Sequence, residues 1–181
     1  MEYKQTLRLR DGRLCVLRNG TAEDGQAVLD IFRLTHTQTD HLLTYPEEMD
    51  ITPEQEGDFL CKKAGSLNEV ELLAEVEGRL VGTAGIACVC PKEKTRHRAE
   101  LGISVERDFW GLGVGRALME GCIACAVRAG YAQLELSVFS DNERALALYR
   151  KLGFVEYGRN PRGFRSRLTE WQELVLMRLT L

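Results

Sequence analysis

The stretch of sequence that decides the fold is Val105-Glu106-Arg107-Asp108-Phe109-Trp110-Gly111-Leu112-Gly113-Val114-Gly115-Arg116-Ala117-Leu118. Apolar residues precede it, alternating glycines fill its centre, and a run with helical apolar spacing follows it directly. Glycine lets a backbone approach a ligand closely, and the free N–H groups at the start of a helix attract anions. The stretch therefore predicts a strand, a phosphate-binding turn and a helix. A tight turn that holds no ligand is the alternative interpretation.

The glycine spacing argues against the common nucleotide-binding motifs. Gly111, Gly113 and Gly115 do not follow the G-x-G-x-x-G pattern of dinucleotide folds, and the turn lacks the lysine and hydroxyl residue of a nucleotide P-loop. The next predicted strand, 133–139, has its only acidic residue in the middle, whereas a ribose contact requires one at the strand's end. We therefore expect a pyrophosphate-bearing cofactor of another kind.

Apolar periodicity on both sides of this stretch predicts the other elements. An Asp11-Gly12 pair between alternating runs predicts a hairpin, and Thr21 and Thr52 each mark the start of a helix. Further strands are expected at 70–76, 80–90, 98–105 and 133–139, helices at 113–129 and 142–151, and two last strands at 154–157 and 174–179, separated by a loop rich in arginine. The order ββαα-βββ-α-β-α-ββ predicts an α/β protein of the mixed α+β kind, with one mixed sheet of about seven strands and about four helices. We expect a single domain, 1–181.

A second motif runs from Asn142 to Phe154, with the sequence NERALALYRKLGF. Asn142 is placed to cap the helix, and Ala145 and Tyr149 share one helix face. Tyr149 would have an apolar environment at one end and a hydroxyl able to donate a proton at the other. Taken alone, this pattern is also typical of a tyrosine that only packs in a core.

The two motifs, in this order, resemble the GNAT (Gcn5-related) N-acetyltransferase superfamily, in its bacterial single-domain form. The family pattern Q/R-x-x-G-x-G/A falls on Trp110 to Gly115, with tryptophan in place of Gln or Arg, and the pattern N-x-x-A-x-x-L-Y-x-x-x-G-F matches from Asn142 to Phe154 without a gap. The resemblance covers at least residues 70–154. It implies a GNAT acyl-CoA N-acyltransferase fold and an enzyme that moves an acetyl group from acetyl-CoA to a primary amine by direct attack in a ternary complex. A non-catalytic acyl-CoA-binding or regulatory module on the same fold is the alternative.

The resemblance also implies roles for particular residues. Tyr149 would protonate the departing thiolate, and the backbone N–H near Val105 would bind the thioester oxygen. The pantetheine arm would run between the strands at 98–105 and 133–139. The residues expected to bind the cofactor are Val105, Leu112, Gly113, Val114, Gly115, Arg116 and Asn142.

The strand at 98–105 suggests a general base. Alternation places Arg98, Glu100, Gly102 and Ser104 on one face and apolar residues on the other. The small residues 102 and 104 leave room for a cofactor arm, and Glu100 stands at the end of that space. We expect Glu100 to act as the base through a water molecule, while a solvated or salt-bridged strand glutamate is the alternative.

The sequence does not identify the acceptor amine. The segment from Asp40 to Asp58 has seven acidic residues and no Lys or Arg, which favours a cationic amine. In the loop before the last strand, four arginines (Arg159, Arg162, Arg165 and Arg167) suit an anionic substrate, the cofactor phosphates or only water. The acceptor is therefore left as a small-molecule amine or a protein amino group.

Composition excludes several other classes. A net charge of −3 and a pI near 5.7 argue against a protein built to hold nucleic acid. The first residues lack the apolar core of a signal peptide, and no apolar run reaches membrane-spanning length, so we expect a cytoplasmic protein with no membrane partner. The pairs Cys88/Cys90 and Cys122/Cys125 have no histidine at ligand spacing, so we expect packing and no metal. A homodimer through the last strands is conceivable.

Overall fold

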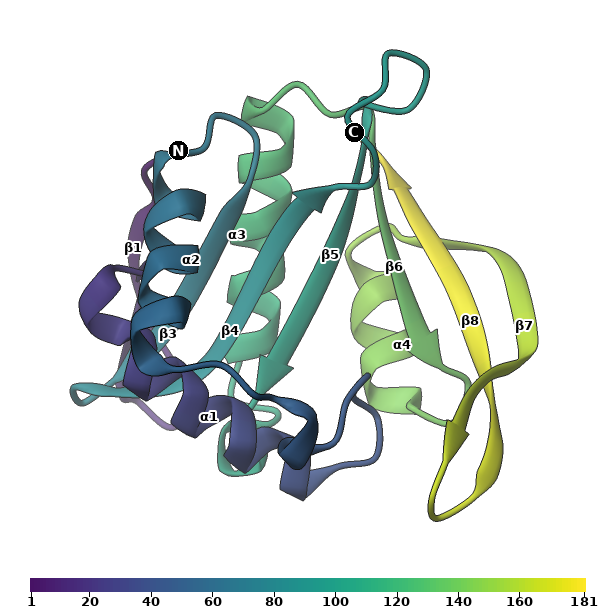
Figure 1. Ribbon diagram of the computed structural model, residues 1–181, viewed down its shortest axis with the longest axis horizontal. Coiled ribbons are helices and arrows are strands. Elements are labelled where there is room, and N and C mark those ends of the chain that lie inside the picture. Colours follow the sequence, from purple (N-terminus) through teal and green to yellow (C-terminus); the bar gives the residue numbers. More distant parts are fainter.

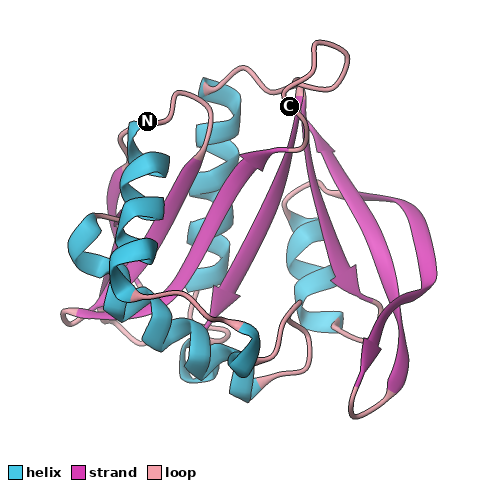
Figure 2. Ribbon diagram, in the orientation of Figure 1, coloured by secondary structure: helices cyan, strands magenta, loops and turns pink.

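The computed structural model describes all residues, Met1–Leu181. One continuous sheet of eight strands runs in the order β1-β2-β3-β4-β5-β6-β8-β7, and helices cover both of its faces (Figures 1 and 2). The strands are β1 Lys4–Arg8, β2 Leu14–Asn19, β3 Val70–Val76, β4 Arg79–Cys88, β5 Arg98–Val105, β6 Gln133–Phe139, β7 Val155–Ser166 and β8 Glu170–Thr180. The helices are α1 Gly25–Gln38, α2 Pro53–Gly65, α3 Val114–Arg128 and α4 Glu143–Lys151. The α/β class, the mixed sheet and the predicted order of elements are confirmed.

The two faces of the sheet carry separate cores because successive strand residues point in opposite directions. On β3, Leu72 belongs to a large cluster that includes buried residues of α3 and α4, whereas Leu73 packs with Val28 of α1 and Leu60 of α2. The helices α3 and α4 therefore cover one face, and α1 and α2 the other. None of the helices has the length and apolar content needed to cross a membrane.

Local sequence explains how α1 and α2 start and why they lie so close together. Thr52 Oγ1 accepts a hydrogen bond from the N–H of Gln55, whose side chain accepts one from the N–H of Thr52, and Pro53 takes the first helical position. A Cβ at Gly57 of α2 would lie 2.6 Å from the carbonyl oxygen of Ala22, and one at Gly25 of α1 would clash with the carbonyl of Pro53. Glycine at both contacts lets the start of α1 and the start of α2 pack closely against each other.

The last two strands differ from the sequence-based expectation. Residues 159–167, expected as a loop, lie largely within β7, which forms a long antiparallel hairpin with β8. The pairing shifts register between Glu156 and Gly158 and again between Asn160 and Phe164. Such bulges absorb extra residues and interrupt the alternation of apolar side chains, so the segment does not have the pattern of a strand. The hairpin is therefore longer than predicted, while the sheet has eight strands, the number in the predicted order of elements.

The sheet opens between β5 and β6, and this opening positions the site. The two strands are parallel and pair over only three positions, Arg98 with Gln133, Ala99 with Leu134 and Glu100 with Glu135. Beyond these positions β5 stays paired with β4 and β6 with β8, so the two halves of the sheet diverge (Figure 1). Arg98 and Glu135 form an ion pair at the point where the strands part.

Candidate active site

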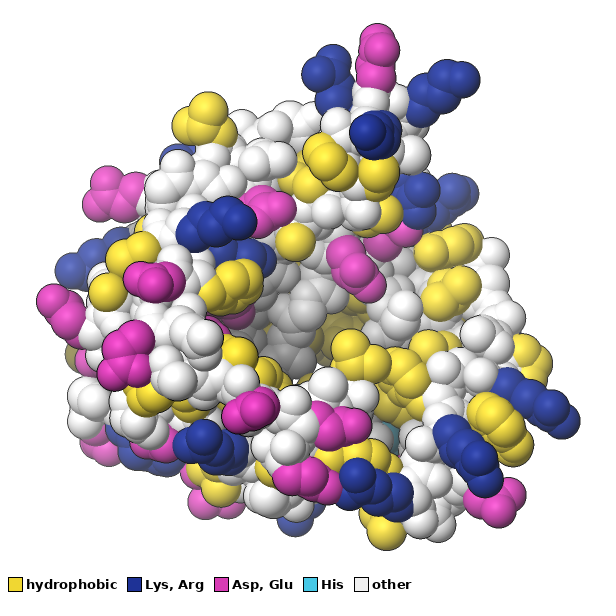
Figure 3. Space-filling model, viewed as in Figure 1, with side chains coloured by type: hydrophobic (Ala, Val, Ile, Leu, Met, Phe, Trp, Pro, Cys, Tyr) yellow, Lys and Arg dark blue, Asp and Glu magenta, His cyan; other side chains and the backbone are white.

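A cleft of about 1540 Å³ occupies the opening between β5 and β6. Its walls come from β5, β6, the glycine turn, α4, the end of α1 and the loop that follows α1. The space-filling view shows the hollow on the face covered by α1 and α2, between the two halves of the sheet (Figure 3). Chain segments far apart in the sequence thus meet around one cavity.

The edge of β5 presents free backbone groups to this cleft. The amide of Glu106 donates to the carbonyl of Val81, and that of Val89 to Arg98, which fixes the hydrogen-bonding parity of the β4–β5 ladder. By this parity Gly102 and Ser104 bond to β4, whereas the N–H and C=O groups of Ile103 and Val105 point toward β6. Because β6 has diverged there, these groups form an open strand edge that a ligand with amide groups can pair with.

Small residues on β5 widen the cleft. A Cβ at Gly102 would meet no atom within 4 Å, so this position borders open space. Ser104 also lines the cleft and makes no side-chain hydrogen bond. The room that the sequence predicted beside Glu100 is present.

The glycine turn leads from the open edge of β5 into α3. Gly111 and Gly113 have φ values of 78° and 112°, in the left-handed region that favours glycine. The first amide bonded along the helix is that of Ala117, which donates to the carbonyl of Gly113. The N–H groups of Val114, Gly115 and Arg116 are therefore free and point out of the helix start, the arrangement that binds phosphate.

The residues expected to bind the cofactor fall into two groups. Val105, Gly113, Gly115, Arg116 and Asn142 line the cleft. Leu112 and Val114 instead pack their side chains into the core, and the amide of Leu112 donates to the carbonyl of Phe109. Asn142 Oδ1 accepts a hydrogen bond from the N–H of Ala145 and so caps α4. Backbone amides remain the means by which residues 113–116 can hold an anion.

Trp110, which departs from the family pattern, has a defined contact. Its Nε1 donates to the carbonyl oxygen of Val105 at 2.6 Å. The guanidinium groups of Arg107 and Arg144 lie over its ring, 5.7 and 5.2 Å from the centroid. The indole therefore satisfies one free carbonyl of the β5 edge and holds two cations at the mouth of the glycine turn.

Arg10, in the turn of the first hairpin, is a residue of the site that sequence reasoning missed. Its amide donates to the carbonyl of Leu112, and its guanidinium donates to the carbonyl of Gly111 at 3.0 Å. These bonds join segments about a hundred positions apart, so no local pattern could have indicated them. The hydrogen bonds of Arg10 hold the glycine turn in place, and its side chain also lines the cleft.

Tyr149 is buried in the wall of the cleft, with 8% of its surface exposed. Its ring lies 6.0 Å from that of Phe154, and no protein group hydrogen-bonds its hydroxyl. Burial raises the pKa of Tyr149 to about 12. The phenol therefore keeps its proton over the whole physiological range and can donate it to a group bound in the cleft.

Glu100 also lines the cleft, on the face of the sheet away from α3 and α4. Its side chain is exposed and has no ion pair, although Arg98 and Glu135 lie on the same face and pair with each other. Glu100 and Tyr149 therefore reach one cavity from opposite faces of the sheet, which is open only between β5 and β6.

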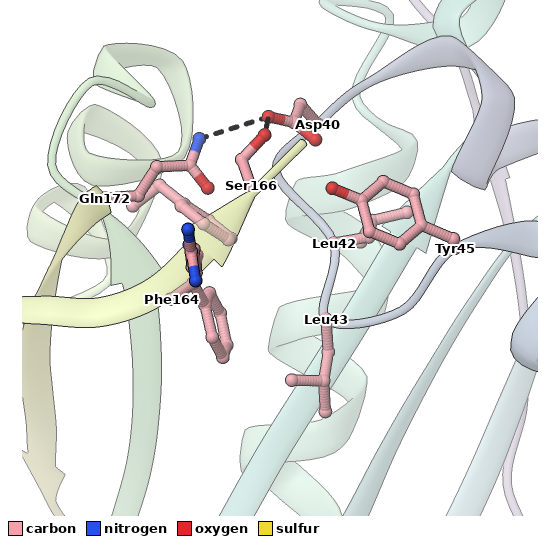
Figure 4. Close-up of a pocket in the computed structure, with 9 residues that line it drawn as sticks. Asp40, Leu42, Leu43, Tyr45, Phe164, Ser166 and Gln172 are labelled. Carbon is pink, nitrogen blue, oxygen red and sulfur yellow. Dashed lines mark hydrogen bonds between the residues drawn. The ribbon is translucent and has the colours of Figure 1, made fainter. Parts of the chain in front are cut away.

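The loop after α1 and the β7–β8 hairpin contact each other across the open end of the cleft (Figure 4). Ser166 donates to Asp40 at 2.5 Å, and Gln172 donates to the same carboxylate at 3.3 Å. Arg167 forms an ion pair with Glu47 and lies 3.9 Å from the centroid of the Tyr45 ring. The acidic and basic segments noted in the sequence are thus in part each other's partners.

Two histidines of the α1 region line the cleft. His41 Nε2 lies 3.1 Å from Asp141 Oδ1, which ties the loop after α1 to the loop between β6 and α4. His36 Nδ1 lies 2.7 Å from the carbonyl oxygen of Phe32, and burial lowers the pKa of His36. Since a carbonyl oxygen only accepts, Nδ1 carries the proton and Nε2 of the neutral ring is left with a free lone pair.

The cysteines have no ligand geometry. All six are free thiols, Cys122 and Cys125 are fully buried in the core, and burial raises the pKa of Cys122 well above its usual range. No group of three or more His, Cys, Asp or Glu side chains is arranged to hold a metal ion. The buried pair packs as small apolar residues, as expected from its helical spacing.

Comparison with known proteins gives consistent matches. Residues 26–154 match the model of the acetyltransferase (GNAT) family. The N-alpha-acetyltransferase RimI of Mycobacterium tuberculosis is 38% identical over 88 residues, which is 49% of this chain and 53% of that protein. The chain spans about half the length of the first curated relatives it matches, between 38% and 63% for three of them.

Solved structures share the fold over nearly the whole chain. An acetyltransferase of the GNAT family from Streptococcus pneumoniae superposes with a TM-score of 0.87 at 27% identity, covering 92% of this chain and 99% of that one. The acetyltransferase yncA of Salmonella typhimurium, solved with acetyl-CoA, has a TM-score of 0.80 at 21% identity over 92% of this chain and 94% of that one. The second likeness shows the fold alone.

Proposed function

The chain belongs to the GNAT acetyltransferase family, and from this premise we propose that it transfers the acetyl group of acetyl-CoA to a primary amine by direct attack in a ternary complex. The observation that carries the proposal is the open backbone edge of β5, which ends at the free N-terminus of α3 beside a buried tyrosine. The acetyl-CoA complex of the Salmonella typhimurium acetyltransferase supports this cofactor for the fold.

Acetyl-CoA fits the chemistry of the cleft along its length. Its pyrophosphate would accept hydrogen bonds from the N–H groups of Val114, Gly115 and Arg116. The amides of its pantetheine arm would pair with the free N–H and C=O of Ile103 and the free N–H of Val105, where a further strand would otherwise continue the sheet. The guanidinium groups of Arg107 and Arg144, held over Trp110, lie where the phosphate charges require them.

The transfer itself needs a hydrogen-bond donor to the developing oxyanion and a group that gives a proton to the leaving sulfur. The amine nitrogen attacks the thioester carbonyl, and the negative charge that develops on oxygen would be stabilised by a free backbone N–H of the β5 edge near Val105. As the C–S bond breaks, Tyr149 gives its proton to the sulfur. Burial raises the pKa of Tyr149, and removal from water raises that of the thiol in the same way, so the transfer stays close to balanced.

The attacking nitrogen must lose a proton before or during attack. Glu100 is our candidate for the base, acting through water, because its carboxylate has no ion-pair partner and borders the space beside Gly102. A protonated amine loses this first proton to Glu100 before attack. The nitrogen loses a second proton as the C–S bond breaks, which restores the Tyr149 phenol and leaves a neutral acetamide and free coenzyme A.

A non-catalytic acyl-CoA-binding module would use the same turn and strand edge. The features it would not need are the unpartnered hydroxyl of Tyr149 and the unpaired carboxylate of Glu100, both directed at one cavity.

We also propose that the continuous sheet makes residues 1–181 one domain, and that the free thiols suit a cytoplasmic location. Pairing of two copies through the β7 edge stays a prediction.

Thiol release from acetyl-CoA with a panel of amines tests the proposed function. We expect release that depends on the amine and equals the amount of acetylated product found by mass spectrometry. Binding of acetyl-CoA without release for any small amine or peptide would favour the non-catalytic module. The absence of acetyl-CoA binding would contradict both.

A further inference from the structure

We infer that the acceptor is a primary amine attached to an apolar group, with no free carboxylate next to the amine. The inference rests on the proposed function, because it concerns what enters the cleft opposite the cofactor. Three features of the acceptor end carry it: apolar walls, unpaired carboxylates, and arginines that are directed elsewhere.

The walls of the acceptor end are mostly apolar and aromatic. Phe139 of β6 lies 4.9 Å from Phe164 of β7 and 5.6 Å from His41, measured between ring centroids. Leu42, Leu43 and Tyr45 of the loop after α1 face this aromatic pair across a small pocket of about 70 Å³ (Figure 4). Such a surface gains free energy by burying an apolar substituent of the acceptor.

Carboxylates without a cationic partner border the same space. Asp40 accepts hydrogen bonds from Ser166 and Gln172, both neutral groups and both through Oδ2, so its charge is not balanced and its Oδ1 is free. Glu100 likewise has no ion pair. A protonated amine bound in the cleft would supply a positive charge that neither carboxylate now has beside it.

Of the arginines of the β7–β8 hairpin, only Arg165 is among the residues that line the small pocket, and it has no ion pair. Arg159 bonds to Glu156 and Glu173, and Arg167 pairs with Glu47. Phe164, Ser166 and Gln172 share the face that contacts Asp40, so alternation places Arg165 and its cross-strand partner Trp171 on the other face. The guanidinium of Arg165 lies 5.6 Å from the Trp171 ring centroid, and that of Arg162 lies 5.3 Å from it.

Most of the remaining cations of the cleft lie around the glycine turn. Arg10, Arg107, Arg116 and Arg144 surround the glycine turn and the start of α4, and Lys151 belongs to the end of α4. Charge in the cleft is therefore divided unevenly, with most of the positive groups where the cofactor phosphates would lie and the unpaired carboxylates of Asp40 and Glu100 elsewhere in the cleft.

This division selects against a free α-amino acid. Its carboxylate, two bonds from the nitrogen, would enter beside Asp40 and Glu100 and leave water without gaining a cation, which costs binding free energy. An amide or a hydrogen at that position removes the cost. The amino terminus of a peptide and a small arylalkyl amine share this chemistry.

Binding to the coenzyme A-loaded protein, measured by calorimetry, tests the inference without requiring turnover. The matched ligands are L-phenylalanine, L-phenylalaninamide and phenethylamine at a pH where all three amines are protonated. We expect the amide and phenethylamine to bind at least about tenfold tighter than phenylalanine, which corresponds to ~1.4 kcal/mol. A peptide that begins with phenylalanine separates the two sources: tighter binding than phenethylamine points to a peptide amino terminus, and weaker binding to a small amine.

Two variants locate the discrimination. Asp40→Asn should reduce the preference for the amide over the free acid, with coenzyme A affinity unchanged as a check on folding. Arg165→Gln should leave the preference unchanged, because this arginine faces away from Asp40. Loss of phenylalanine binding in Arg165→Gln alone would show that the hairpin recognises a carboxylate and would overturn the inference.

The outcomes separate the inference from the function on which it rests. Phenylalanine binding as tightly as its amide, or no binding of any of the amines, would overturn the inference. Thiol release with phenylalanine as the preferred acceptor would overturn it while the proposed function stands. Tight binding of the amide without thiol release would overturn the function and leave the ligand preference standing.

Discussion

At the scale of single residues, the surroundings of Tyr149 are those of a proton donor and differ from those of a tyrosine that only packs in a core. A tyrosine that only packs usually finds a partner for its hydroxyl, whereas that of Tyr149 has none and its ring lines the cleft. The burial that raises its pKa to about 12 also keeps it protonated. Its charge state is therefore independent of pH under ordinary assay conditions.

Tyr149→Phe tests this role. The substitution removes one oxygen from a site with no hydrogen-bond partner, so stability and acetyl-CoA affinity should change little, while kcat should fall by about 100-fold or more. In the wild type, kcat should show no decline from ionisation of Tyr149 below about pH 10, because a raised pKa leaves the phenol protonated below that value. Steady-state kinetics over a pH series measure both.

Tyr157→Phe is the matched control, since Tyr157 lies on the outer hairpin and its hydroxyl contacts only Glu135, at 3.5 Å. Its kcat should stay near that of the wild type. A Tyr149→Phe enzyme with wild-type kcat would show that another group protonates the thiolate.

Sequence patterns predicted residues such as Tyr149 because their neighbours in the chain define them. A helix cap, an i,i+3/i+4 face and a strand alternation are all local, so Asn142, Tyr149 and Glu100 could be named in advance. Arg10 and the aromatic pair of Phe139 and Phe164 could not, because their contacts join segments that only the folded sheet brings together. The ion pair of Arg167 with Glu47 could not be predicted either, for the same reason.

At the scale of elements, the start of α3 combines a left-handed glycine with free helix amides. Gly113 adopts φ 112° and precedes the free N–H groups of residues 114–116. Gly115, two residues further along the chain, has ordinary helical geometry. A Cβ there would make only ordinary contacts, the nearest at 3.7 Å from Leu148. The two glycines therefore serve different purposes.

Gly113→Ala and Gly115→Ala form a matched pair. A left-handed alanine costs about 1–2 kcal/mol, so Gly113→Ala should lower stability and, by turning the amides away, weaken acetyl-CoA binding at least about tenfold. Gly115→Ala should bind acetyl-CoA within about threefold of the wild type. Thermal unfolding and calorimetry measure the two effects, and equal losses in both variants would contradict the assignment of the anion site.

The β7–β8 hairpin shows where element prediction from sequence fails. Its two register shifts and the residues Pro161 and Gly163 interrupt the period of two on which strand prediction depends. The other strands and all the helices keep their period over their whole length, and their positions agree with expectation within a few residues. The sequence therefore predicted the strands and helices around the proposed cofactor site better than the hairpin that would meet the acceptor.

At the scale of the whole molecule, a buried ion pair joins α2 to the sheet. Lys63 of α2 lies 3.7 Å from Glu71 of β3 and donates to the carbonyl of Ile86 at 3.2 Å. Burial raises the pKa of Glu71 to about 7, although Lys63 opposes the shift. Between about pH 4.5 and pH 7 the folded protein therefore binds a proton at Glu71 that the unfolded chain has released.

This linkage predicts how stability depends on pH. Because the folded state holds more protons in that window, the contribution of Glu71 to the unfolding free energy falls as pH rises through about 7. Glu71→Gln cannot titrate, so the difference in unfolding free energy between wild type and variant should fall from pH 5 to pH 7 and level off above pH 8. Urea unfolding at a series of pH values measures it, and a difference that rises with pH would contradict the shift.

The central claim concerns the opening in the sheet, where a cofactor would replace the pairing that β5 and β6 lose. Residue-resolved amide hydrogen exchange, with and without acetyl-CoA, tests it most directly. The account predicts new protection at Ile103, Val105 and residues 114–116, and no change at Gly102 and Ser104, whose amides already bond to β4. Protection confined to other segments, or equal changes along β5, would contradict the claim that acetyl-CoA lies along this edge.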